Sequence, residues 1–133
     1  PWAFENPVSG FSSIFGKPQY SFHPYEFGGY LPECDTHPIW PDYIKPRDAY
    51  PKKTCLWTGG DFTMPVPSPV YPEEGHSRQH LKLGGKSMKT KNIRSATPRG
   101  FAQAVFNSNN STMQSLLGEY KQRGDNDVCN TCN

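Results

Sequence analysis

The sequence predicts a single α/β domain, in which short strands alternate with helices and long irregular segments. Apolar side chains alternate along residues 2–6 and 52–59, as in strands, whereas residues 101–105 repeat them at helical spacing. A chain of 133 residues suits one domain. Its 14 prolines and 12 glycines indicate a loop-rich fold, and an aromatic content of 14% argues against disorder.

The chain begins with a predicted strand and a predicted helix. Residues 2–6 alternate as "WAFEN", and Pro7 ends the strand because proline cannot donate to a sheet ladder. Apolar residues within 8–19 then recur at helical spacing, and Gly16 and Pro18 stop that helix.

Two more strands are expected on either side of an irregular excursion. Residues 20–27, "YSFHPYEF", have alternating aromatics and an interruption at Pro24. Residues 30–51 contain five prolines and are expected to be ordered but irregular. Residues 52–59, "KKTCLWTG", have the strongest strand pattern in the chain, and the prolines of 64–72 keep the next segment extended.

The remaining part combines a basic segment with helices. We expect residues 75–96 to form a long flexible loop because they are basic and contain glycine. Thr97 is expected to cap a helix whose first residue is Pro98. A second helix is predicted from Ser111, and it is followed by a polar tail.

Positive charge is concentrated in one segment of a chain whose net charge is only +2. No acidic residue lies between Gly75 and Gly118. The predicted nucleic-acid-binding cations of this segment are Arg78, Lys82, Lys86, Lys89, Lys91 and Arg94. A local basic block favours a phosphate-bearing partner, and a solvated loop that only aids solubility is the alternative. Lys52 and Lys53 enter a strand and are further candidates to hold a phosphate, although isolated lysines are more often solvated.

Four residues have the types and local spacing of zinc ligands. Cys34 and His37 form a C-x-x-H pair, and Cys129 and Cys132 form a C-x-x-C pair. The alternative is a frayed tail with two free thiols. No apolar run reaches membrane-spanning length, and the context favours an intracellular protein.

Glu5 and Asn6 stand at the end of the first predicted strand. In open α/β sheets, ligands bind at the carboxyl ends of strands. A carboxylate there can accept a hydrogen bond from an amino group of a ligand. The alternative is a loop glutamate next to an asparagine that makes a turn.

Three segments follow one another along the chain: "WAFENPVSGFSSIFGKPQYSFHPYEFG", "YPKKTCLWTG" and "RSATPRGFAQAVF". Together and in this order they resemble the carboxyl-terminal half of phage-type DNA cytosine (carbon-5) methyltransferases. The resemblance covers roughly residues 2–106 and implies part of a Rossmann-like methyltransferase sheet. We therefore expect residues 1–107 to form half of a methyltransferase-like domain, and residues 108–133 to add a helix and a polar tail.

The resemblance also implies roles for individual residues. In that family the Glu of the Glu-Asn motif holds the flipped cytosine and stabilises the intermediate formed when a cysteine attacks the base. This role falls on Glu5, with Asn6 as its neighbour. Lys52 and Lys53 coincide with a basic motif near the active-site edge, and the segment 75–96 coincides with the region that contacts DNA.

The family's S-adenosylmethionine loop and Pro-Cys nucleophile precede the Glu-Asn motif, and no cysteine of this chain follows a proline. We therefore expect the chain to be inactive alone, as one half of a split enzyme, a fragment of a longer protein or a remnant that kept the DNA-facing half. Its expected partners are DNA and a complementary methyltransferase half or another phage protein, in the cytoplasm of a host cell. A non-enzymatic phage structural or DNA-binding protein, stabilised by zinc, is the main alternative. RNA binding through exposed aromatics and basic loops is the third.

Overall fold

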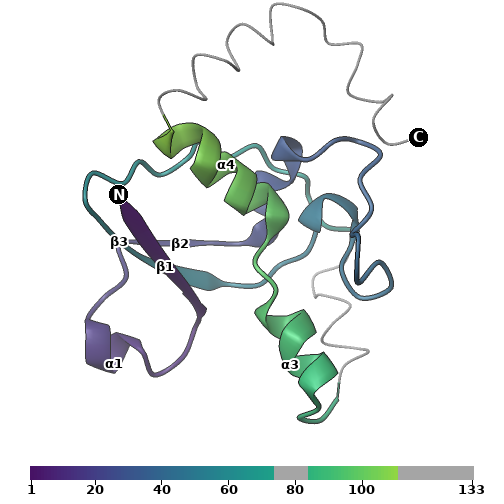
Figure 1. Ribbon diagram of the computed structural model, residues 1–133, viewed down its shortest axis with the longest axis horizontal. Helices are drawn as coiled ribbons and strands as arrows, with labels where there is room; N and C mark the ends of the chain where they lie inside the picture. The colour runs from purple at the N-terminus through teal and green to yellow at the C-terminus, as the bar shows by residue number, and fades with distance from the viewer. Residues whose placement is uncertain (74–83, 111–133) are drawn as a thin grey trace, which may run out of the picture.

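The computed structural model describes residues 1–73 and 84–110 (Figure 1). The strands in this part of the chain are β1 (Trp2–Pro7), β2 (Tyr20–Phe22) and β3 (Thr54–Gly59). The helices are α1 (Ser12–Phe15), α3 (Met88–Ser95) and α4 (Arg99–Asn109), with the 3-10 helices η1 (Pro24–Tyr30) and η2 (Pro46–Asp48). The described residues therefore have a mixed α/β architecture.

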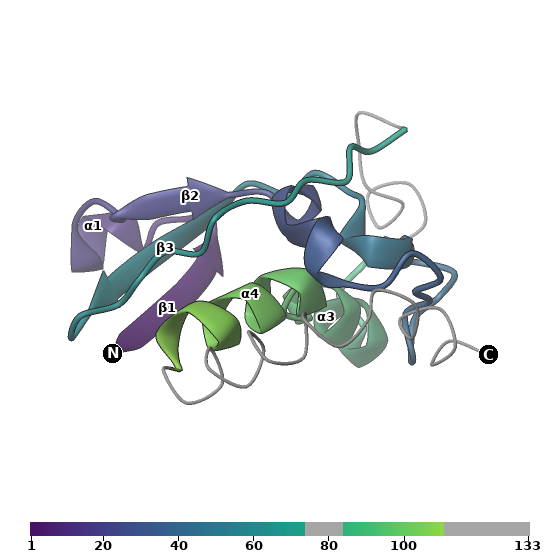
Figure 2. The same ribbon diagram turned by 90° about the horizontal axis from the view of Figure 1, so that it is seen from above.

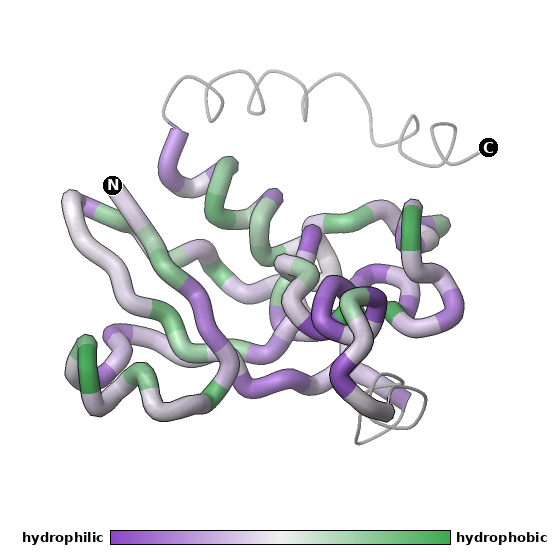
Figure 3. Tube along the Cα trace, turned by 60° about the horizontal axis from the view of Figure 1, so that its bottom comes forward, coloured by the Kyte–Doolittle hydropathy of each residue, from purple (hydrophilic) through white to green (hydrophobic). Residues whose placement is uncertain are grey.

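The strands form one antiparallel sheet in the order β1-β3-β2. Glu5 lies opposite Leu56, and Phe4 lies opposite Trp57. Because successive side chains of a strand point to opposite faces, Glu5 and Leu56 share one face, and Phe4 and Trp57 share the other. Along β1, the strand that starts near the N mark, the residues change from hydrophobic (green) to hydrophilic (purple) in Figure 3.

The sheet and helix α4 form two layers around the main core (Figure 2). The buried residues of this core are Phe22, Phe27, Leu56, Phe101 and Ala104. Phe101 stacks on Phe22 with ring centroids 3.9 Å apart and meets the edge of Phe27 at 5.1 Å. Burial of these aromatic rings provides much of the hydrophobic stabilisation that holds α4 on the sheet.

The predicted excursion, residues 30–51, is ordered and irregular, as expected. Ile44 and Tyr50 pack with Ile93 of α3 in a second buried cluster. Arg99 at the start of α4 binds Asp35 through two hydrogen bonds of 2.9 and 2.7 Å. These contacts attach the excursion to both α3 and α4.

Two predicted elements differ in the structure. The strand expected over 20–27 ends at Phe22, and η1 follows it, because Glu26 accepts a hydrogen bond from the backbone N–H of His23 and completes a capping box. The loop expected over 75–96 contains helix α3, which is capped by the side chain of Ser87.

Two smaller differences concern the helix boundaries. The helix expected within 8–19 is limited to α1, although it ends at Gly16 as predicted. The N-cap position of α4 is Pro98, so Thr97 is not the cap of this helix. The helix predicted from Ser111 and the tail lie outside the described residues.

Candidate functional site

Glu5 lies near the carboxyl end of β1, on the face of the sheet that is turned toward α4. Its side chain contributes to a cavity of about 340 Å³ between β1 and α4. The other residues that line the cavity are Ala3, Leu56, Thr97, Phe101, Ala102, Val105 and Phe106. The cavity is therefore mostly apolar, with one carboxylate and one hydroxyl. Ligand sites in proteins commonly have this composition and this size.

Three segments that are far apart in the sequence meet around Glu5. The hydroxyl of Thr97 donates a hydrogen bond of 3.5 Å to Oε1 of Glu5. The ammonium of Lys52 donates to the backbone carbonyl of Arg94. Burial lowers the pKa of Lys52, and the negative charge of Glu5 acts in the opposite direction.

Asn6, the second predicted catalytic residue, does not share the face of Glu5. Strand alternation turns its side chain to the other face of the sheet. Its amide Nδ2 donates a 2.7 Å hydrogen bond to the hydroxyl of Ser9. In this structure Asn6 therefore stabilises the turn after β1.

The structure describes six of the eight predicted nucleic-acid-binding cations: Lys52, Lys53, Lys86, Lys89, Lys91 and Arg94. Lys53, Lys86, Lys89 and Lys91 are exposed, and the last two lie on α3. Lys89 also lies over the ring of Tyr43, 5.1 Å from its centroid. Because Lys52 contacts the carbonyl of Arg94 at the end of α3, this basic helix adjoins the Glu5 site. Arg78 and Lys82 lie outside the described residues.

The predicted zinc ligands are only partly described. His37 is buried, and its Nδ1 accepts hydrogen bonds from the backbone N–H groups of Ile39 (3.2 Å) and Trp40 (2.9 Å). A metal would therefore bind through Nε2 of this ring. Cys129 and Cys132 lie outside residues 1–73 and 84–110. Cys34 is exposed and disulfide-bonded in this structure, so its thiolate is not free to bind a metal here. Within those ranges no group of three or more His, Cys, Asp or Glu side chains could hold a metal, and the four-ligand zinc site stays a prediction.

Comparison of the chain with protein-family models, with characterised proteins and with solved structures finds no match. In the described part of the chain, no helix has the length and hydrophobicity needed to cross a membrane.

Proposed function

We propose that this chain is the DNA-facing half of a DNA cytosine methyltransferase, the enzyme that transfers a methyl group from S-adenosylmethionine to cytosine. The observation that carries the proposal is the position of Glu5. Its carboxylate lies at the carboxyl end of β1, beside an apolar cavity of about 340 Å³, and accepts a hydrogen bond from Thr97. The motif that contains Glu5 is also the one for which the family resemblance implies base recognition.

Glu5 would bind the base after the base leaves the DNA helix. Enzymes that modify a base in duplex DNA must first extrude it, because its reactive atoms are buried in the stack. In the proposed site, Glu5 hydrogen-bonds the polar edge of cytosine, while apolar residues such as Val105 exclude water from the ring. In its protonated form, the carboxyl group of Glu5 donates a hydrogen bond to the ring and stabilises the negative charge that develops there during nucleophilic attack.

We propose that S-adenosylmethionine binds to another polypeptide. The sequence contains no Gly-rich donor loop and no Pro-Cys pair. In the proposed reaction, a complementary amino-terminal half supplies both the methyl donor and the cysteine nucleophile. This chain binds the base, orients it and contacts DNA.

The Rossmann-like sheet remains part of the proposal. Both strand pairs of the described residues are antiparallel, because β1 and β2 each run antiparallel to the central strand β3. A doubly wound sheet is mostly parallel and carries antiparallel strands at its edge, so its parallel strands would come from the complementary half. The sheet of this chain would then be one side of a larger mixed sheet.

The proposal is tested by complementation. The chain is mixed with the amino-terminal half of a phage-type cytosine methyltransferase, and transfer of labelled methyl from S-adenosylmethionine to duplex DNA is measured. We expect transfer with both halves and none with either alone. Glu5→Gln in the complemented enzyme should lower the rate by about 100-fold or more, since a positioned acid or base contributes at least that much.

The matched control is Glu33→Gln, because Glu33 is an exposed carboxylate in the excursion. It should leave the rate unchanged. Full activity of the complemented Glu5→Gln variant would show that the role assigned to Glu5 is wrong. Stoichiometric zinc in the purified chain, with no transfer in the presence of the partner, would favour the non-enzymatic alternative.

A further inference from the structure

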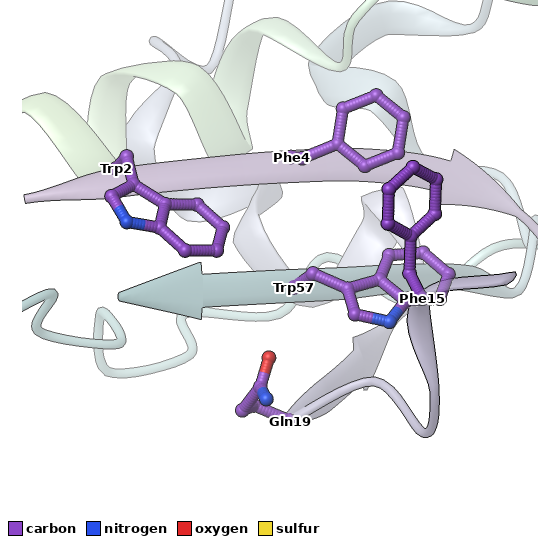
Figure 4. Close-up of a pocket in the computed structure, with 5 residues that line it drawn as sticks. All are labelled: Trp2, Phe4, Phe15, Gln19 and Trp57. Carbon is purple, nitrogen blue, oxygen red and sulfur yellow. The ribbon is translucent and has the colours of Figure 1, made fainter. Parts of the chain in front are cut away.

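The face of the sheet opposite α4 carries a group of aromatic side chains, Trp2, Phe4, Phe11, Phe15 and Trp57, called here the aromatic face. Phe4 lies at its centre, with ring centroids about 6 Å from those of Phe11, Phe15 and Trp57. Trp2 and Phe15 are 57% and 59% exposed. Together with Gln19, four of these residues line a cavity of about 370 Å³ (Figure 4). A contiguous exposed apolar patch of this kind marks an interaction site.

Strand β1, which carries Trp2 and Phe4, also has an unpaired edge within the described residues. β1 is the first strand in the order β1-β3-β2, so within the described residues its outer edge has no partner strand. Backbone N–H and C=O groups along such an edge are a template for pairing with another strand. The aromatic face and the open edge meet on β1, since Trp2 and Phe4 belong to this strand.

The charge of this region indicates the chemistry of the partner. Glu5 is the only charged side chain between Trp2 and Gly16, and it lies on the other face of the sheet. Binding of nucleic acid needs cations that neutralise phosphates. An uncharged aromatic face combined with a free strand edge instead fits a polypeptide that has an apolar surface and a strand of its own.

A second copy of this chain cannot satisfy both features through one contact. If two β1 strands paired edge to edge, the sheets would join and each aromatic face would stay on the surface of the joined sheet. If two aromatic faces packed together, both β1 edges would stay unpaired. A different polypeptide can add a strand to β1 and cover the aromatic face with the element that follows.

We propose that the outer edge of β1 and the aromatic face together form the docking surface for a second polypeptide, which extends the sheet by a strand. This inference deepens the proposed function, and the identity of the partner as the complementary methyltransferase half rests on it. Docking at β1 would place the partner beside the strand that carries Glu5.

The experiment uses the amino-terminal half of a phage-type cytosine methyltransferase as the probe. Its affinity for the chain is measured by calorimetry, and hydrogen exchange of Trp2–Pro7 is followed with and without it. We expect a one-to-one complex in which the backbone amides of β1 exchange more slowly. Trp2→Lys and Phe15→Lys should each weaken binding about tenfold or more, because a charge then faces a desolvated contact.

Two controls test whether weaker binding of the lysine variants comes from the aromatic face itself. Ile39→Lys introduces the same charge at a residue that is 67% exposed in the excursion, and it should leave the affinity unchanged. Circular dichroism of each variant checks that the fold is retained. A complex with protected β1 amides but without methyl transfer would support the docking surface and refute the proposed function.

Three results would overturn the docking proposal. One is the absence of a complex with the probe, and another is a complex that Trp2→Lys and Phe15→Lys leave intact. The third is a dimer of the chain alone that Trp2→Lys dissociates, which would assign the surface to a second copy. If Trp2→Lys and Phe15→Lys both retain methyl transfer, the proposed function is kept and the docking surface is refuted.

Discussion

At the scale of single residues, Arg99 neutralises two buried carboxylates. It binds Asp35 through both oxygens, and its Nη2 lies 3.9 Å from Oδ1 of Asp48. Asp48 also accepts the backbone N–H of Gly100 at 3.0 Å. Burial raises the pKa of Asp48, and the Gly100 hydrogen bond and Arg99 only partly oppose this effect. For Asp35 the partners outweigh burial, so its pKa is lowered.

Removal of the shared cation should destabilise the protein strongly. Arg99→Met leaves Asp35 and the fully buried Asp48 without their positive partner. We expect the free energy of unfolding in urea to fall by about 3–5 kcal/mol, the usual effect of breaking a buried ion pair. Lys91→Met, at an exposed position of α3, should change it by less than about 0.5 kcal/mol. Equal effects of the two variants would contradict the role of Arg99.

The lowered pKa of Lys52 predicts how stability depends on alkaline pH. Burial lowers this pKa below its ordinary value of 10.5, so between the two values the unfolded chain binds more protons than the folded one. The free energy of unfolding should therefore rise with pH in this window. Urea unfolding should show this rise in the wild-type chain relative to Lys52→Met. Lys53→Met controls for the loss of one charge, and a parallel pH dependence of the wild-type chain and Lys52→Met would refute the prediction.

At the scale of the elements, helix α4 sits close to η1 because its second residue is a glycine. A Cβ at Gly100 would lie 2.4 Å from the backbone oxygen of Phe27. The contact is between the backbones of α4 and η1, and neither can shift as a flexible side chain could. The close approach of the helix to η1 therefore requires this glycine.

We therefore expect Gly100→Ala to destabilise the fold although alanine is the better helix former. The expected loss is about 1–3 kcal/mol in the free energy of unfolding, as for other overpacked sites. Gly84→Ala is the matched control, because a Cβ there meets no atom within 4 Å. Thermal and urea unfolding of both variants provide the measurement, and a Gly100→Ala variant as stable as the control would rule out the steric contact.

The sequence predicted strands better than it predicted short helices. β1 and β3 follow from alternation and from flanking proline or glycine, which are local signals. The strand over 20–27 was extended too far because η1 buries Phe27, so an aromatic pattern that resembled a strand belongs to a 3-10 turn. Helix α3 was missed because only Thr90 and Ile93 are buried in it, which leaves too few apolar residues for a visible period.

At the scale of the whole molecule, the proposed contact between DNA and the exposed cations in and before α3 predicts an affinity for DNA that falls as the salt concentration rises. Each phosphate contact contributes a slope of about −0.9 to the plot of log affinity against log salt concentration. Replacement of both Lys86 and Lys91 by glutamine should therefore make the slope shallower by about 2. Lys17→Gln, beyond α1, controls for net charge and should change the slope little. Fluorescence anisotropy of a labelled duplex gives these values, and an unchanged slope would exclude the two lysines from the interface.

The candidate site was predictable only in part, because it is assembled from distant segments. Glu5 and Lys52 were predicted from their positions at strand ends, and in the structure the charge of Glu5 opposes the lowering of the Lys52 pKa. Thr97 was interpreted as a helix cap, yet its hydroxyl faces Glu5, 92 residues away in the sequence. A contact over that distance depends on how α4 packs on the sheet, and no local pattern of residues encodes it.

The alternation of β1 has a consequence for insertions and deletions. Glu5 faces the cavity beside α4, while Trp2 and Phe4 face the opposite side of the sheet. Because the side-chain period of a strand is two, a shift of one residue exchanges the two sides completely. Loss of the codon for Asn6 or for Pro7 would thus move the carboxylate away from its cavity and the aromatic rings away from their surface in a single event, whereas loss of both codons would keep each side chain on its own face.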